Sequence, residues 1–149
     1  MKICCFAGHS SISNNKKIKI KVTNEIINLI ENEGVTAFYS GGQGSFDWLC
    51  AHCVDELKKV YSFIQSYLIL AYMPKEKDNY YNETLNLFDN TIYPDIEKTP
   101  LRLAIVKRNE WMINNSDFLI TYIWHSCGGA ARTFEYAKSK KHIKIINIV

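Results

Sequence analysis

Short glycine-rich segments are the parts of this sequence whose residue types and spacing point most directly to chemistry. They are residues 40–45 (SGGQGS) and residues 126–129 (SCGG), with a third polar turn at residues 8–10 (GHS). Glycine lets a backbone approach phosphate closely, and the first turn of a helix offers unpaired N–H groups with partial positive charge. We therefore expect anion-binding turns here, although glycine turns between strands and helices also occur without a ligand.

Arginine is rare in this chain and lies around the second glycine turn. Lysine and arginine together number 18, and only Arg102, Arg108 and Arg132 are arginines. A guanidinium binds phosphate or carboxylate with a planar fork that lysine lacks. We expect Arg108 in particular to contact a ligand, while a surface ion pair is the alternative for each of the three.

Two carboxylates and a histidine follow the predicted turns. Glu135 comes seven residues after Gly128, where it could act as an acid, a base or an acceptor for a ribose hydroxyl; its alternative is an exposed glutamate that stabilises the helix dipole. Asp47 follows the first glycine loop, and its alternative role is a helix cap. The expected ligand-binding set is Gly8, His9, Ser40, Gly41, Gly42, Gly44, Asp47, Gly128, Gly129, Arg132 and Thr133.

Cys50 and Cys53 have the spacing of half a zinc or redox site. Both fall on the apolar face of a predicted helix together with Leu49 and Leu57, which favours packing, and a second pair at ligand spacing is missing. We predict neither a metal nor a cofactor. Five cysteines, an odd number, and no export signal indicate reduced thiols.

Predicted strands and helices alternate along the chain. The strands are expected at residues 2–7, 35–39, 64–72, 117–123 and 143–148, with helices after each glycine loop, after residues 10–15 and over residues 101–115. Residues 75–99 are expected to form a loop with one short helix. This order predicts a Rossmann-like three-layer α/β/α sandwich with a mainly parallel sheet of about five strands, in a single domain over residues 1–149.

Composition and missing motifs argue against several classes of protein. The glycine loops lack both the G-x-G-x-x-G pattern followed by an acidic residue and the G-K-[ST] pattern, so neither hydride transfer with a dinucleotide nor P-loop hydrolysis is expected. The net charge of +3 is too small to demand a nucleic-acid partner. The opening apolar run is too short for a signal peptide, and no stretch would span a membrane, so we expect a cytoplasmic protein.

Two motifs resemble the SLOG superfamily, which includes YpsA-like proteins, the DNA-processing protein DprA and the Lonely Guy phosphoribohydrolases. The opening CCFAGHS is similar to the F-T-G-H-R start of the YpsA-like branch, with Ser10 in place of the arginine. The segment FYSGGQGSFDWLCA resembles the S-G-G-A-x-G-x-D loop of that branch. The resemblance covers nearly the whole chain and implies a Rossmann-like nucleotide-binding domain.

A third motif is similar to the Lonely Guy enzymes. The run from Arg108 to Asp117 resembles their R-x-x-x-M…S-D-A-F-I run, which precedes a P-G-G-x-G-T-x-x-E turn. Matching Gly128 and Gly129 to that turn places Glu135 on its glutamate, so the resemblance implies that Arg108 and Glu135 form a catalytic pair. The departures from this turn are Cys127 for proline, Ala131 for glycine and Arg132 for threonine.

Three functions fit these observations. The first is a sensor or sequestering domain for a nucleotide or ribose-phosphate ligand, with the glycines and Arg108 on phosphate and Glu135 on ribose. The second is a phosphoribohydrolase that cleaves the N-glycosidic bond of a nucleoside 5′-monophosphate, and the third is DprA-like binding of single-stranded DNA. We also expect a homo-oligomer, a dimer or larger, with residues 101–115 as a candidate contact.

Overall fold

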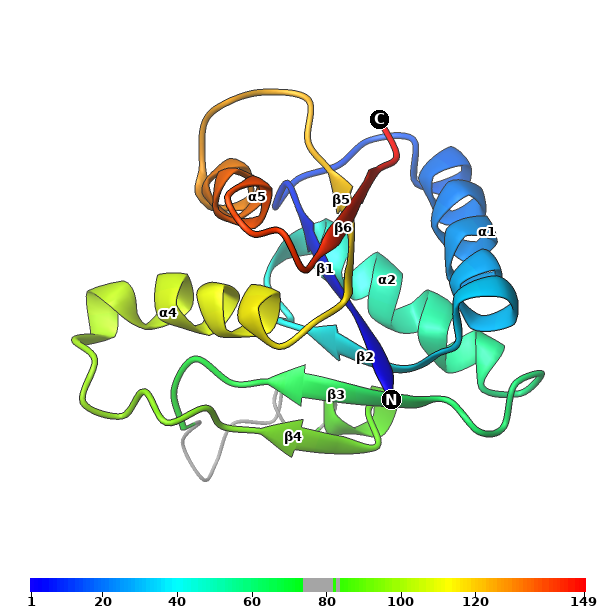
Figure 1. Cartoon of the computed structure of the whole chain (residues 1–149), viewed down its shortest axis with the longest axis horizontal. Helices are drawn as coiled ribbons and strands as arrows, with labels where there is room; N and C mark the ends of the chain where they lie inside the picture. The colour runs from blue at the N-terminus through cyan, green and yellow to red at the C-terminus, as the bar shows by residue number, and fades with distance from the viewer. Residues whose placement is uncertain (74–81, 83) are drawn as a thin grey trace.

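The strand β1 (Lys2–Gly8) lies in the middle of a parallel sheet, as its continuous apolar run predicts. The structure is a computed structural model that describes residues 1–73, 82 and 84–149. The other strands are β2 (Val35–Ser40), β3 (Gln65–Ile69), β4 (Asn90–Ile92), β5 (Phe118–Tyr122) and β6 (Lys144–Asn147). Within these residues the strand order is β4-β3-β2-β1-β5-β6, and every neighbouring pair is parallel (Figure 1).

Helices cover both faces of this sheet. Successive side chains of β1 point to opposite faces, so Phe6 joins one core cluster and Cys5 joins another. The helices α1 (Asn15–Glu33) and α2 (Gly44–Leu57) contribute to the cluster of Phe6, whereas α4 (Leu101–Asn114) and α5 (Gly129–Lys138) contribute to that of Cys5 (Figure 1). The predicted Rossmann-like α/β fold is therefore confirmed.

The strand β4 is a short addition to the expected sheet. It lies within residues 75–99, which the sequence predicts as a loop with one helix; the described part of this segment contains the 3-10 turn η1 (Leu85–Leu87) and β4, and residues 74–81 and 83 are outside the described residues. The Asp89 carboxylate accepts a hydrogen bond from the Ser66 backbone N–H at 2.7 Å and lies 2.9 Å from Lys58 Nζ. Polar contacts thus hold β4 in place, which explains why hydrophobic periodicity misses it.

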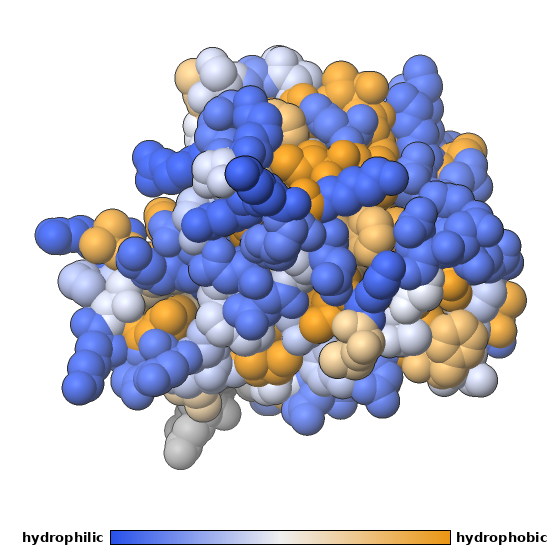
Figure 2. All heavy atoms as spheres, viewed as in Figure 1, coloured by the Kyte–Doolittle hydropathy of each residue, from blue (hydrophilic) through white to orange (hydrophobic). Residues whose placement is uncertain are grey.

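Polar side chains cover most of the face shown in Figure 2, with an apolar area in the region of β5 and β6. Four of the five cysteines are buried, including Cys50 and Cys53 on the packed face of α2. Among the described residues, no helix is both long and apolar enough to cross a bilayer. The helix α4 exposes Leu101 and Leu103, where the expected contact with a second copy stays a prediction.

Candidate functional site

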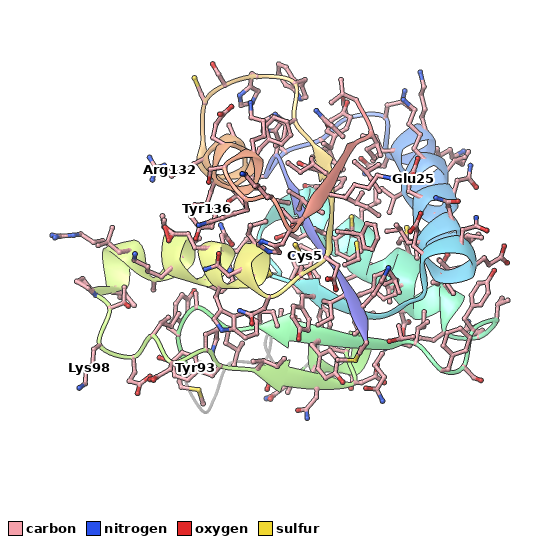
Figure 3. All side chains as sticks on the ribbon, viewed as in Figure 1. Cys5, Glu25, Tyr93, Lys98, Arg132 and Tyr136 are labelled. Atoms are coloured by element: carbon pink, nitrogen blue, oxygen red, sulfur yellow. The ribbon has the colours of Figure 1, made fainter. Side chains whose placement is uncertain are left out.

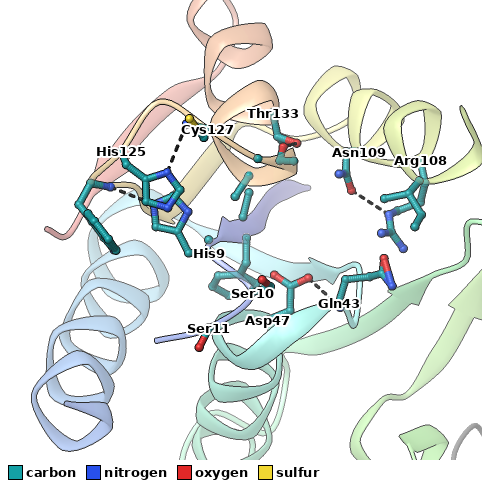
Figure 4. A pocket seen from close by; sticks show the side chains of 18 residues that line it. His9, Ser10, Ser11, Gln43, Asp47, Arg108, Asn109, His125, Cys127 and Thr133 are labelled. Atoms are coloured by element: carbon teal, nitrogen blue, oxygen red, sulfur yellow. Dashed lines mark hydrogen bonds between the residues drawn. The ribbon is translucent and has the colours of Figure 1, made fainter. Parts of the chain in front are cut away.

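Loops from the carboxyl ends of three strands surround a cavity of about 510 Å³ (Figure 4). Its walls come from the end of β1 and the turn after it (residues 6–11), from Gln43 and Asp47 after β2, from residues within 124–133 after β5, and from Ile105, Arg108 and Asn109 of α4. The three polar turns therefore lie at one edge of the sheet. The volume lies within the range of about 300–1,000 Å³ that is usual for small-molecule sites.

The first glycine loop uses three of its backbone N–H groups within the chain. Ser45 N donates to the Ser10 carbonyl at 2.8 Å, Gln43 N donates to Asp47 Oδ2 at 2.9 Å, and Gly42 N donates to Ser40 Oγ at 3.3 Å. A Cβ on Gly44 would lie 2.6 Å from the Ser10 Cα, so this glycine permits close packing of two loops. The loop therefore shapes the cavity wall, and Gly41, Gly42 and Gly44 are not among its lining residues.

The second glycine turn presents free N–H groups to the cavity. Gly128, at a φ of 95°, precedes the first residue of α5, and Gly128, Gly129 and Ala130 line the cavity. In the part of the chain that the structure describes, no acceptor bonds to their backbone N–H groups, and no side chain caps the helix. Thr133, one helical turn later, is buried and donates to the Gly129 carbonyl at 3.0 Å. This helix start can therefore accept an anion.

Arg108 is a buried cation that ties α4 to the sheet edge. It is 3% exposed; its Nη1 donates to the carbonyls of Gly41 at 2.8 Å and Ile69 at 3.1 Å, and its Nε donates to Asn109 Oδ1 at 2.8 Å. Burial lowers the pKa of Arg108 and the Asp47 carboxylate opposes that shift, while arginine keeps its charge in proteins. Among the described residues Nη2 has no partner, so this nitrogen is free for a ligand.

Asp47 places a carboxyl group on the part of the cavity wall that α2 forms, across from the start of α5 (Figure 4). It lies in the first turn of α2 and is 7% exposed. Burial raises the pKa of Asp47 to about 7, against the Gln43 N–H and the Arg108 charge, which both lower it. This carboxyl exchanges its proton near neutral pH, as a general acid or base must.

A stacked pair of imidazoles closes another side of the cavity. His9 is 6% exposed, and its ring lies 3.7 Å from that of His125, centroid to centroid, at an interplanar angle of 9°. His9 Nε2 accepts the Trp124 backbone N–H at 3.1 Å, and His125 Nδ1 accepts that of Cys127 at 3.2 Å. Both rings thereby hold the loop that leads to the second glycine turn. Burial lowers the pKa of His9, and the neighbouring His125 lowers it further. No local pattern of the sequence indicates this pairing, because it joins residues 116 positions apart.

Glu135 and Arg132 lie apart from the cavity that contains Arg108. Glu135 Oε1 is 2.7 Å from Lys138 Nζ on a side chain that is 68% exposed, and it lines a separate hollow next to the loop 123–126. A helix turns by about 100° per residue, so Thr133 shares the face of Gly129 and Glu135 points roughly 120° away. Arg132 is exposed on the outer side of α5, whereas Tyr136 lies between α5 and α4 and donates to Asn114 Oδ1 at 2.8 Å (Figure 3). Arg108 and Glu135 are therefore not brought together.

The described residues contain no group of three His, Cys, Asp or Glu side chains that would hold a metal ion. The cavity instead combines a helix start, one cation and one titratable carboxyl. This combination can bind a single anionic group and exchange a proton beside it.

Comparison with known proteins supports the resemblance seen in the sequence. The profile of the YspA SLOG family matches residues 6–147. The uncharacterized SPbeta prophage-derived protein YoqJ of Bacillus subtilis (strain 168) is 29% identical in an alignment of 142 positions that covers 82% of this chain and 81% of that protein. The X-ray structure of TM1055, a Northeast Structural Genomics Consortium target, matches the fold with a TM-score of 0.59 at 16% identity, over 93% of this chain and 69% of that one.

Proposed function

Because the chain belongs to the YspA SLOG family, we propose that it binds a nucleotide or a nucleotide-derived ribose-phosphate ligand at the carboxyl edge of its sheet, as a sensor or sequestering domain. The observation that supports this most strongly is the set of free N–H groups at Gly128, Gly129 and Ala130, which open into the cavity. A phosphate there would accept from these groups and from Nη2 of Arg108.

The rest of the cavity suits a ligand with one phosphate group. Gly42, Gln43 and Ser45 of the first glycine loop use their N–H groups on Ser40, Asp47 and Ser10, and the glycines of this loop do not line the cavity. Within the described residues, the cavity wall therefore offers the unpaired N–H groups at the start of α5 and the buried guanidinium of Arg108. The Asp47 carboxyl is one group on the cavity wall that can hydrogen-bond a ribose hydroxyl. A monophosphate therefore fits this wall better than a triphosphate, which needs more positive charge.

Calorimetric titration with a panel of ligands tests the proposed function. Ribose 5-phosphate and the common nucleoside 5′-monophosphates are compared with the matching nucleosides, which differ only by the phosphate. At least one phosphorylated compound is expected to bind with an affinity about tenfold or more above its nucleoside, since charge-assisted hydrogen bonds contribute about 1.5–3 kcal/mol each. Equal affinity for both forms, or no binding of any compound, would refute the proposal.

Hydrolysis of the N-glycosidic bond is the second candidate, because a carboxyl that titrates near neutral pH lines the cavity. Free base measured in the same samples tests it. The Glu135→Gln variant is expected to keep ligand affinity and any base release within about twofold of wild type, since this exposed side chain pairs with Lys138 outside the cavity. A tenfold loss in either quantity would instead place Glu135 at the ligand.

A further inference from the structure

The Asp47 carboxyl is the acidic group that a bound anion would meet. One of its oxygens, Oδ2, accepts the Gln43 N–H, and the group is 7% exposed on the wall of the cavity that receives the start of α5. The titratable or charged groups around it are Arg108 from α4, Cys5 from β1 and Cys50 from α2, and the cavity also contains His9, His125 and Cys127.

These neighbours leave Asp47 as the group that responds to an anion. Arg108 is a fixed charge, and its hydrogen bonds to two carbonyls hold it in place. His9 and His125 each use a ring nitrogen to accept a backbone N–H, so protonation at that nitrogen would break a hydrogen bond. The buried thiols of Cys5 and Cys50 have raised pKa values, chiefly through desolvation, and stay neutral.

Two negative charges in one cavity of low polarity repel each other strongly unless one of them is neutralised. A phosphate dianion at Gly128–Ala130 and an ionised Asp47 would be such a pair. Protonation of Asp47 removes the repulsion, and the resulting O–H becomes a hydrogen-bond donor toward the ligand. A carboxyl whose pKa is already near 7 takes up this proton readily.

We propose that binding of a dianionic ligand group in this cavity is coupled to the uptake of one proton by Asp47. This inference rests on the proposed function and adds the charge state that the site selects: a dianion together with a neutral carboxylic acid. Ligand affinity then depends on pH, so the chain retains its ligand in mildly acidic conditions and releases it more readily as the pH rises above 7.

Sulfate is the probe for this coupling, because it keeps both charges over the whole pH range and cannot itself supply or take a proton. Calorimetric titration of the wild-type chain at pH 8, in buffers of different ionisation enthalpy, measures the protons bound per sulfate. We expect about 0.5–0.9 proton taken up at pH 8 and about zero at pH 5.5, where Asp47 is already protonated. The affinity for sulfate should fall about tenfold between pH 6 and pH 8.

The Asp47→Asn variant replaces the carboxyl with a neutral group of the same shape. It should take up no proton, bind sulfate about tenfold more tightly than wild type at pH 8, and vary less than twofold between pH 6 and pH 8. Asp55→Asn, on the same helix and outside the cavity, is the matched control and should behave as wild type. If the Asp47→Asn variant still takes up a proton on binding sulfate, another group binds that proton and the inference is wrong.

A second measurement does not depend on ligand binding. Burial raises the pKa of Asp47 from 3.8 to about 7, so the protonated form favours the folded state. The stability of wild type relative to Asp47→Asn should therefore fall as the pH rises from 4 to 7, measured by urea unfolding. If the wild-type chain binds sulfate without taking up a proton, the coupling is refuted but the proposed function is not. If neither the wild-type chain nor the variant binds sulfate or any phosphorylated compound of the panel at any pH, the proposed function is refuted.

Discussion

Replacing Gly129 with proline is expected to lower the affinity for phosphorylated ligands, or for sulfate, by about tenfold to a hundredfold. Gly129 is the first residue of α5, a position where proline fits a helix but has no N–H to donate. No atom lies within 4 Å of a Cβ built on this glycine, so the ring has room. The substitution thus removes one N–H donor from the proposed anion site at Gly128–Ala130 and leaves the helix in place.

Gly129→Ala is the matched control for this experiment. It adds a side chain at the same position and keeps the N–H, so its affinity should stay within about twofold of wild type. Circular dichroism and calorimetry on both variants separate loss of the donor from loss of the helix. Equal affinity in the proline and wild-type chains would show that the phosphate does not use the start of α5.

The sequence predicts the fold well because its signals are local. The apolar run of β1 and the helix expected after residues 10–15 each depend on neighbours within a few residues, and the structure confirms both. The strand β4 was missed because Asp89, Ser66 and Lys58 hold it through polar contacts between distant segments. Hydrophobic patterns do not record such contacts.

The site was only partly predictable, for two physical reasons. Both glycine loops look alike in sequence, but only tertiary contacts such as that of Ser45 N with the Ser10 carbonyl show that the first loop packs against its neighbour and that its glycines do not line the cavity. The stack of His9 on His125 likewise depends on how two loops meet at the sheet edge. Glu135 differs, because counting 100° per residue from Gly129 would have placed it on another face of α5.

These findings give the two glycine loops unequal roles. The first loop folds against Ser10 and positions Asp47, so its glycines serve close packing. The second loop is held by two stacked imidazoles, and the N–H groups of Gly128, Gly129 and Ala130 have no acceptor among the described residues. The first loop therefore has a structural role, and the second is the one that the proposed function assigns to the ligand.

Arg108→Met is expected to lower the free energy of unfolding by about 3 kcal/mol even without ligand. Methionine keeps the length of the side chain but leaves the Gly41 and Ile69 carbonyls without their donor, and each lost hydrogen bond of this kind contributes about 1–1.5 kcal/mol. It also removes the positive charge that opposes the rise in the pKa of Asp47, so that pKa should rise further. Urea unfolding at pH 7.5 measures the change.

Arg102→Met serves as the control for Arg108→Met, because Arg102 is exposed on the same helix and should change stability by less than about 0.5 kcal/mol. Arg108→Lys keeps a charge but not the fork, so it should recover only part of the lost stability. An Arg108→Met chain as stable as wild type that no longer binds the panel would make Arg108 a ligand group alone. Loss of both stability and binding would instead support a dual role, in which Nη1 holds the ends of β2 and β3 while the unpaired Nη2 binds the ligand.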